Sequence, residues 1–300
     1  MIEARPPDQE EELTVGDGAL HVEHFLPRGA PAGSIVFVHG FDAHCGLYRQ
    51  LGTSLAAQGY AATLYDGRGH GRSTGRRGHI ARFEQYETDL AAVAARNRAL
   101  LPEARPFVVM GHSQGGLVVL DAVIRGAIAP APDRMVLVTP WLGLALPVPW
   151  WKRAASPLFD RLWPTLSMNN GLQAGDISRN PTLVKIRAED PLIHHVASAR
   201  WFEEALRAQA RVQAGVAPLH IPTLILVAGQ DRIVSSEAIL EFAGKAGPAV
   251  AVRRYEAAYH DLFIEPEQDQ VMTDIVSWLR APVAPAPDLD RAPRAVPGML

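Results

Sequence analysis

Ser113 lies in the sequence Gly111-His112-Ser113-Gln114-Gly115, between a short apolar segment and a longer one. Glycines two residues before and two residues after the serine indicate a backbone turn too tight for side chains at those positions. A sharp strand-to-helix turn of this kind presents a serine hydroxyl as a nucleophile. The same pattern also occurs in strand-to-helix connections without chemistry, so the rest of the chain must supply a base, an acid and an oxyanion hole.

The most suitable base is His260. A serine hydroxyl is a weak nucleophile near neutral pH and needs an imidazole to accept its proton. Among the eleven histidines, His260 is the one that follows the last strand-like segment and precedes the final helical pattern. The alternatives lie near the N-terminus, in the irregular middle of the chain or before a proline: His21, His24, His194, His195 and His220.

The acid that orients this histidine is predicted to be Asp231, which follows the apolar segment TLILVA. A polar turn or a helix cap is the alternative role for this residue. Asp133 precedes a strand and Asp261 is adjacent to His260, so both are weaker candidates, as is Asp190 in the irregular region. The order Ser113, Asp231, His260 is the order in which α/β-hydrolases carry their catalytic residues.

An oxyanion hole needs two backbone amides directed at the developing negative charge. The first is predicted at Gln114, directly after the serine, because that position follows the turn. The second is predicted at Phe41, which follows the segment IVFVHG, where Gly40 gives the backbone freedom to turn. Asp66 also follows a strand, but it is expected to fix its own loop together with Arg68, His70 and Arg72.

Six short apolar segments predict strands, and segments with apolar residues three and four apart predict helices between most of them. The predicted strands are Ser34–Val38, Ala61–Tyr65, Pro106–Met110, Arg134–Val138, Thr223–Ala228 and Val250–Tyr255. The predicted helices are Gln50–Gln58, Phe83–Leu101, Gln114–Arg125, Ser236–Ala243 and Asp269–Arg280. This alternation predicts an α/β fold with a mostly parallel central sheet and helices on both faces. Such a sheet gathers its reactive loops at the carboxyl ends of its strands.

The alternation is interrupted between residues 140 and 216, which predicts a mainly helical cap inserted into a core formed by residues 13–139 and 217–280. Four of the six tryptophans lie in the first part of this insertion. Three of them, Trp141, Trp150 and Trp151, are predicted to line a pocket for an apolar acyl chain. The alternative is that these aromatic side chains anchor the insertion to the sheet.

Composition excludes several other classes of function. A net charge of −3 gives no basic surface for nucleic acid, and 48% hydrophobic residues in 300 are enough for a large core. The single cysteine, Cys45, excludes an intrachain disulfide framework, which favours a reducing, cytoplasmic location.

The two ends of the chain are predicted to lie outside the core. Residues 1–12 are acidic, lack the pattern of a secretory signal and are expected to form a mobile tail. The Pro/Ala-rich residues 281–300 are expected to form a second tail. No apolar segment reaches the ~20 residues of a membrane-spanning helix, so contact with lipid surfaces is expected to be transient at most.

Several motifs together resemble the monoacylglycerol lipase and lysophospholipase-like branch of the α/β-hydrolase superfamily, over approximately Leu13 to Arg280. They are HGFDAH, YDGRGHGRS, GHSQGG, LVAGQDRIV, YHDLFIEP and the insertion segment SRNPTLVKIRAEDPLIHHVASAR. The resemblance implies that Ser113, Asp231 and His260 are the catalytic residues. It also implies that the amides of Phe41 and Gln114 form the oxyanion hole, and that neither a metal nor an organic cofactor is used. Family members commonly have a small residue at the position of Phe41, so its ring is expected to crowd the acyl site.

The residues and the resemblance together predict a serine hydrolase that cleaves carboxylic esters of apolar acyl chains through an acyl-enzyme on Ser113. A small-ester, thioester or aminoacyl/peptide hydrolase of the same fold is the first alternative. A non-catalytic, hydrolase-like binding protein is the second. An aspartate-nucleophile hydrolase is disfavoured because position 113 is a serine.

Overall fold

The computed structural model of the chain describes residues 4–215 and 219–282. In these residues, eight strands form one sheet in the order β1-β2-β4-β3-β5-β6-β9-β10. The strands are β1 (Gln9–Val15), β2 (Gly18–Phe25), β3 (Ser34–Val38), β4 (Ala61–Tyr65), β5 (Phe107–His112), β6 (Arg134–Val138), β9 (Thr223–Ala228) and β10 (Val250–Tyr255). β1 and β2 pair antiparallel with each other, and β2 pairs antiparallel with β4, whereas the remaining neighbours are parallel. The predicted α/β-hydrolase fold class is confirmed.

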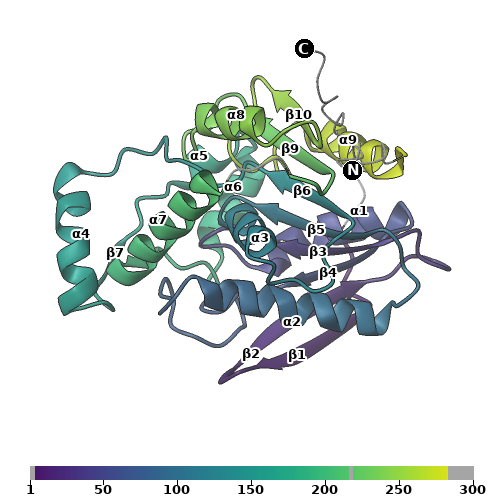
Figure 1. Cartoon of the computed structure of the whole chain (residues 1–300), viewed down its shortest axis with the longest axis horizontal. Helices are drawn as coiled ribbons and strands as arrows, with labels where there is room; N and C mark the ends of the chain where they lie inside the picture. Colours follow the sequence, from purple (N-terminus) through teal and green to yellow (C-terminus); the bar gives the residue numbers. More distant parts are fainter. Residues whose placement is uncertain (1–3, 216–218, 283–300) are drawn as a thin grey trace, which may run out of the picture.

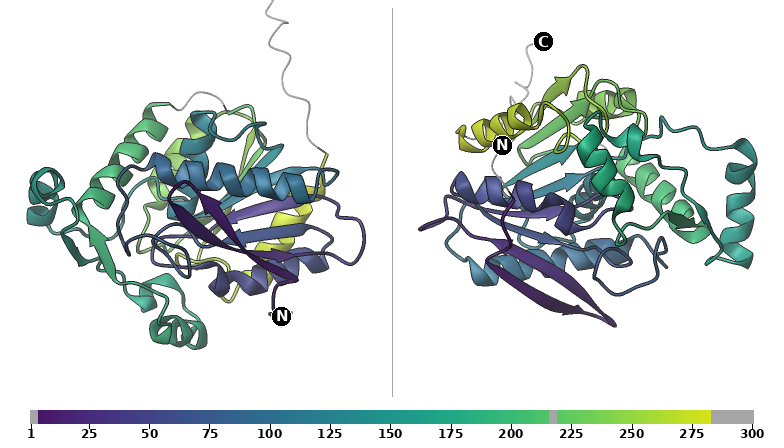
Figure 2. Two further views of the ribbon diagram at one scale, coloured as in Figure 1. Left: turned by 90° about the horizontal axis from the view of Figure 1, so that it is seen from below. Right: turned by 180° about the vertical axis from the view of Figure 1, so that it is seen from behind.

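Helices cover both faces of the sheet (Figures 1 and 2). The helices of the core are α1 (Arg49–Ala57), α2 (Glu84–Leu100), α3 (Gln114–Ile124), α8 (Ser236–Lys245) and α9 (Gln268–Arg280), with a short 3-10 helix at Cys45–Tyr48. Successive residues of a strand point to opposite faces, so Val36 belongs to the apolar cluster that includes side chains of α2, α3 and α8, whereas Ile35 belongs to the one that includes α1 and α9. Two apolar layers therefore enclose the parallel strands.

The segment between β6 and β9 is mainly helical, as the sequence predicts. It contains α4 (Trp150–Leu162), α5 (Ala174–Ile177), α6 (Pro181–Glu189) and α7 (Ala199–Ala214). It also contains β7 (Ser167–Asn169) and β8 (Val196–Ser198), which pair antiparallel in a separate small sheet. α7 packs on α3 of the core, and α4 lies beyond α7, away from the main sheet (Figure 1). We refer to residues 140–215 as the insertion.

The N-terminal prediction is wrong for residues 9–12, which belong to β1 rather than to a mobile tail. Their glutamates, read as a sign of an unfolded segment, are held by charged side chains of the core. Glu11 accepts hydrogen bonds from Arg96 and His24, and Glu12 pairs with His21. Residues 283–300, which make up most of the predicted C-terminal tail, lie outside the described residues.

Candidate active site

Ser113 lies directly after β5, at a backbone conformation that non-glycine residues rarely adopt, with φ 54° and ψ −118°. The glycines around it are required by close backbone contacts. A Cβ at Gly111 would come 2.5 Å from the carbonyl oxygen of Gly115, and a Cβ at Gly115 would come 2.6 Å from that of His39. The turn is thus held between β3, β5 and α3, and the predicted role of the two glycines is explained.

Asp231 and His260 follow β9 and β10, and the Nδ1–H of His260 donates to Asp231 Oδ2 at 2.8 Å. The other carboxylate oxygen accepts the amides of Ile233 and Val234, each at 2.8 Å. Burial favours a raised pKa for Asp231, but His260 and these amides outweigh it and hold the pKa below its ordinary value. Asp231 is therefore ionised and orients His260 with Nε2 free for a proton from the serine.

The loop that carries His260 is fixed by two residues that sequence reasoning missed. Thr139, at the end of β6, donates its hydroxyl to the carbonyl oxygen of His260 at 2.9 Å. Glu265 accepts the amide of Tyr259 at 2.8 Å and is itself buried against Arg179 and Ser178. Asp261, the neighbouring carboxylate, accepts from the Tyr48 hydroxyl at 3.0 Å and is not paired with His260. These contacts explain why Asp231 and not Asp261 partners the histidine.

Phe41 and Gln114, the two predicted oxyanion residues, lie just beyond the ends of the adjacent strands β3 and β5, with Gln114 beginning α3. In the described part of the chain, neither backbone amide donates to another residue, which leaves both available to an oxyanion. The ring of Phe41 is stacked on the indole of Trp201 with ring centroids 3.7 Å apart. It is therefore packed against the insertion, although it also lines the cavity.

Asp42, the residue after Phe41, is held by the insertion. It is buried, with φ 54°, and its carboxylate accepts from Arg187 of α6 and from Asn170 at 3.3 Å. Burial favours the neutral acid and raises the pKa of Asp42, whereas Arg187 acts in the opposite direction. Asp42 and Arg187 both lie in motifs that carry the family resemblance, HGFDAH and SRNPTLVKIRAEDPLIHHVASAR, but nothing in the sequence indicated that they pair, because they are far apart in the chain.

Ser113 and His260 line one cavity of about 200 Å³, which lies between the sheet and the insertion. Its wall is mainly apolar and includes Leu144, Leu146, Val148, Phe159, Met168, Leu172, Ile177, Phe202, Ile233 and Val234. Trp141 also lines it and is 5% exposed. The structure therefore places one of the three predicted tryptophans beside the serine.

Trp150 and Trp151 are not among the residues that line this cavity, and the prediction that they wall it is wrong. They are 81% and 50% exposed, because α4 turns a different face inward. Lys152, Ser156 and Phe159 follow the spacing of one helix face and line the cavity. The exposed face carries Trp150, Trp151, Leu158 and Leu162, with Trp163 just beyond the helix. The interrupted alternation of strands and helices located the insertion, but the tryptophan positions could not give the rotation of this helix.

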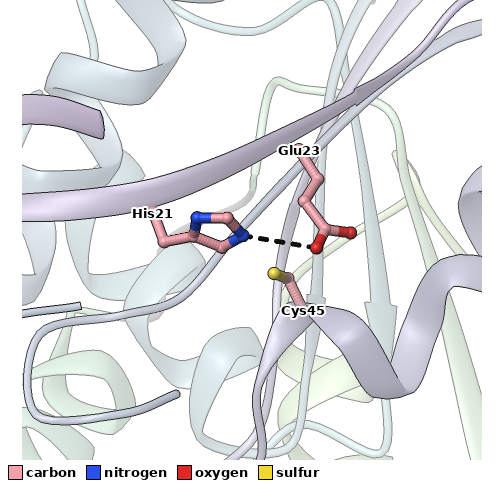
Figure 3. A group of neighbouring side chains, drawn as sticks. All are labelled: His21, Glu23 and Cys45. Carbon is pink, nitrogen blue, oxygen red and sulfur yellow. Dashed lines mark hydrogen bonds and ion pairs between the residues drawn. The ribbon is translucent and has the colours of Figure 1, made fainter. Parts of the chain in front are cut away.

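A second cluster, His21, Glu23 and Cys45, has side chains of the types that bind metals (Figure 3). Glu23, however, already accepts two hydrogen bonds from Arg49, at 2.9 Å and 2.5 Å. Despite burial, His21 and Arg49 hold the pKa of Glu23 at about 2, and burial with nearby carboxylates raises the pKa of the Cys45 thiol. An ion pair beside a neutral thiol accounts for this cluster, since a cation would have to displace Arg49.

Comparison with known proteins agrees with this geometry. Residues 29–267 match the model of the family described as serine aminopeptidase, S33. The chain is 30% identical to phospholipase YtpA of Bacillus subtilis, over 80% of this chain and 92% of that protein. It is also 30% identical to a monoacylglycerol lipase of Mycolicibacterium smegmatis, over 88% and 94% respectively. The crystal structure of a monoacylglycerol lipase from Paleococcus ferrophilus superposes with a TM-score of 0.78 at 28% identity, covering 87% of this chain and 98% of that one.

The parallel sheet, the strained serine turn and the paired Asp231 and His260 are features of a serine-type α/β-hydrolase. The family match covers well over half of the residues. The chain therefore belongs to the serine aminopeptidase S33 family and is similar, within it, to monoacylglycerol lipases and phospholipases. The predicted resemblance and the predicted class of enzyme, a carboxylic ester hydrolase, are confirmed.

Proposed function

We propose that this protein hydrolyses carboxylic esters that carry one apolar acyl chain, of the monoacylglycerol or lysophospholipid type. Ser113 attacks the ester carbonyl while His260 accepts its proton, and the amides of Phe41 and Gln114 stabilise the negatively charged tetrahedral intermediate. His260 then protonates the departing alcohol. Water, activated by the same histidine, releases the fatty acid from Ser113.

One observation carries this proposal. The His260–Asp231 pair, joined at 2.8 Å, opens on the same apolar cavity as a serine held in a strained turn. A nucleophile with its base supports covalent catalysis, and the apolar wall supports an acyl chain as the group to be transferred. The names of the two relatives that are 30% identical support the same substrate class.

The name of the matching family supports a second candidate, cleavage of an aminoacyl or peptide bond. An aminopeptidase must pair the free ammonium group of its substrate with a carboxylate. Two carboxylates line the cavity, and both have partners within the described residues, Asp42 with Arg187 and Asp261 with Tyr48. The cavity therefore favours an uncharged acyl chain over an α-amino group.

The insertion is proposed to act as a cap that meets the lipid. The exposed face of α4 places the tryptophans at 150 and 151 near the cationic Lys152, Arg153 and Arg161. Aromatic and basic side chains on one short helix suit the interface of a lipid surface, where the substrate resides. Within the described residues, each helix is too short or too polar to cross a bilayer. We also propose a cytoplasmic location, because the single cysteine, Cys45, is free and buried and forms no disulfide.

The test is a substrate panel with the purified enzyme. Medium-chain monoacylglycerols and lysophospholipids should give a higher kcat/KM than acetyl esters, thioesters of the same acyl chain or aminoacyl amides. A fluorophosphonate should label the wild type at Ser113 and leave the Ser113→Ala variant unlabelled. Preference for aminoacyl amides would replace the lipid proposal by the peptidase, and absence of labelling would leave a non-catalytic binding protein.

A further inference from the structure

Trp201, in the first turn of α7, contacts both residues whose amides form the proposed oxyanion hole. Its indole is stacked on the ring of Phe41, with centroids 3.7 Å apart and planes 23° from parallel. Its Nε1–H donates to the side-chain oxygen of Gln114 at 3.0 Å. Trp201 belongs to the insertion, whereas its two partners follow β3 and β5 of the core. One side chain thus connects the two halves of the hole.

The indole of Trp201 is itself firmly placed. It is 5% exposed, and its other side faces the ring of Trp141, with centroids 5.4 Å apart and planes 18° from parallel. The backbone amide of Trp201 donates to Ser198 Oγ at 3.1 Å, so the Ser198 side chain caps the start of α7. The same hydroxyl contacts His79 of the core at 2.8 Å. A rigid ring with few rotamers, fixed on both sides, is suited to holding two other groups at a set separation.

The oxyanion loop is held by hydrogen bonds on both sides of Phe41, from His39 to the Gly40 carbonyl and from Arg187 to Asp42, but not at the Phe41 amide itself. Phe41 follows Gly40 and precedes Asp42, which has a positive φ, so neither neighbour belongs to a regular element. Among the described residues, no partner accepts the Phe41 amide. Besides the anchored Asp42, the packing of the Phe41 side chain orients that amide. The ring of Phe41 meets His70 and His194 edge-on and is stacked only on Trp201 among the described residues.

We propose that Trp201 is a positioning residue, which sets the distance and orientation of the Phe41 and Gln114 amides relative to each other. The proposal rests on the proposed function, since it takes these two amides as the oxyanion donors. Trp201 also lines the cavity that holds Ser113 and His260, and the proposal assigns its effect on the rate to these two amides. Because an oxyanion exists only in the transition state and the tetrahedral intermediate, a misplaced amide lowers kcat and leaves ground-state binding nearly unchanged.

The test compares Trp201→Phe and Trp201→Leu with the wild type. Phenylalanine keeps a ring against Phe41 and removes the N–H to Gln114, whereas leucine removes both contacts. We expect kcat to fall about tenfold for Trp201→Phe and about a hundredfold for Trp201→Leu, with little change in KM. Rates are measured on a soluble ester and normalised to sites titrated to completion with a fluorophosphonate. The matched control is Trp278→Phe on α9, on the opposite face of the sheet, which should leave kcat unchanged.

Two further measurements separate positioning from a merely structural role. A boronic acid forms a tetrahedral adduct with the serine, so its inhibition constant should weaken in parallel with kcat. Gln114→Leu removes the acceptor but keeps the backbone amide, and it should lower kcat to the level of Trp201→Phe. The double variant Gln114→Leu/Trp201→Phe should then be no slower than either single variant. Gln114→Leu alone carries the test if the tryptophan variants do not fold.

The outcomes distinguish this inference from the proposed function. If the wild type hydrolyses esters and Trp201→Phe and Gln114→Leu retain full kcat, the positioning role is wrong and the proposed function stands. A change in KM alone would mean that Trp201 acts only as part of the cavity wall, and it would also overturn the positioning role. If the wild type neither hydrolyses esters nor reacts with the fluorophosphonate, the proposed function fails first.

Discussion

The core and the insertion hold their parts of the site in different ways. In the core, strand register and backbone hydrogen bonds fix Ser113, Asp231 and His260, each directly after a strand or in the loop that follows one. The insertion is joined to the core by a few backbone hydrogen bonds, such as those from Ala145 to Ile233 and from Ser198 to Gly78, and by single side chains that reach across to the core. Examples are Trp201 to Gln114, Arg187 to Asp42 and Arg211 to Asp121.

Because of this difference, we expect the core to carry the catalytic chemistry and the insertion to determine which substrate is preferred. A backbone-held constellation tolerates little change at the glycines but does not depend on surface side chains. A region whose contacts with the core are largely made by individual side chains can change its pocket without disturbing the sheet. We therefore expect changes in the core to affect every ester, and changes in the insertion to affect which ester is preferred or how fast it reacts.

The largest effect is expected from the catalytic residues of the core. Ser113→Ala, His260→Ala and Asp231→Asn should each lower kcat by about 10⁴-fold or more, for long and short esters alike, while the fold is retained. The measurement is kcat on two esters of different length, with circular dichroism as a check of folding. Because the residues act as one unit, the Ser113→Ala/His260→Ala double variant should be no worse than the singles. Multiplicative losses would contradict the assignment.

Gly115→Ala tests the backbone constraint of the serine turn. The added Cβ would overlap the carbonyl oxygen of Val38, so unfolding free energy should fall by roughly 1–3 kcal/mol, with loss of activity. Urea denaturation gives the stability. The matched control is Gly175→Ala in α5 of the insertion, where a Cβ meets nothing within 4 Å. If both substitutions lowered the free energy of unfolding equally, the serine turn would be no more constrained than the insertion.

Phe159 and Leu158 test the insertion, since they are adjacent on α4 but face in different directions. In the wild type, kcat/KM should rise about three- to fourfold per acyl carbon until the cavity is full, from ~0.8 kcal/mol per buried methylene. Phe159→Ala should flatten this rise and leave acetyl esters nearly unaffected. Leu158→Ala and Trp150→Ala should not change it for monomeric substrates. The measurement is kcat/KM for esters of increasing length below their micellar concentrations, and a flattened rise in Leu158→Ala would reverse the assigned helix faces.

The smallest expected effect is a pH dependence of stability at the junction of the two regions. Burial and the neighbouring Asp121 raise the pKa of Glu87 from 4.5 to about 7, while Arg125 opposes the shift. The folded state thus binds the proton more tightly than the unfolded state. The stabilisation from Glu87 is present below about pH 4.5 and is lost as the pH rises through about 7. Around the pair lie Glu84 and Arg211, the latter from α7.

The Glu87→Gln variant should lose this part of the pH dependence and be more stable than the wild type at pH values above 7. Urea denaturation at a series of pH values measures it. Glu103→Gln, at an exposed glutamate, is the control and should retain the slope of the wild type. An unchanged slope in Glu87→Gln would assign the pH dependence to other groups.

The contrast between core and insertion also explains which parts of the fold and site could be predicted from the sequence. The strand Ser34–Val38 and its parallel neighbours were predictable, because buried strands need continuous apolar segments and the turns between them need particular residues. Asp231 and His260 were predictable for the same reason, since each follows a strand. Trp201 and Arg187 were not, because their roles depend on how α6 and α7 pack on the core. In α7 the spacing of Trp201, Ala205 and Val212 indicates which face is buried, but it does not say which core residues that face meets.

The position of β1 at the edge of the sheet affects whether the protein associates with other copies of itself. It is an edge strand, and its outer row of backbone groups could pair with another chain and start aggregation (Figure 1). Its sequence QEEELTV places three consecutive glutamates on this edge. These side chains alternate between the two faces of the sheet and are paired with cations of the core, as Glu11 is with Arg96 and Glu12 with His21. A second chain that paired with this edge would have to pack against charged side chains on both faces, and this discourages self-association along β1.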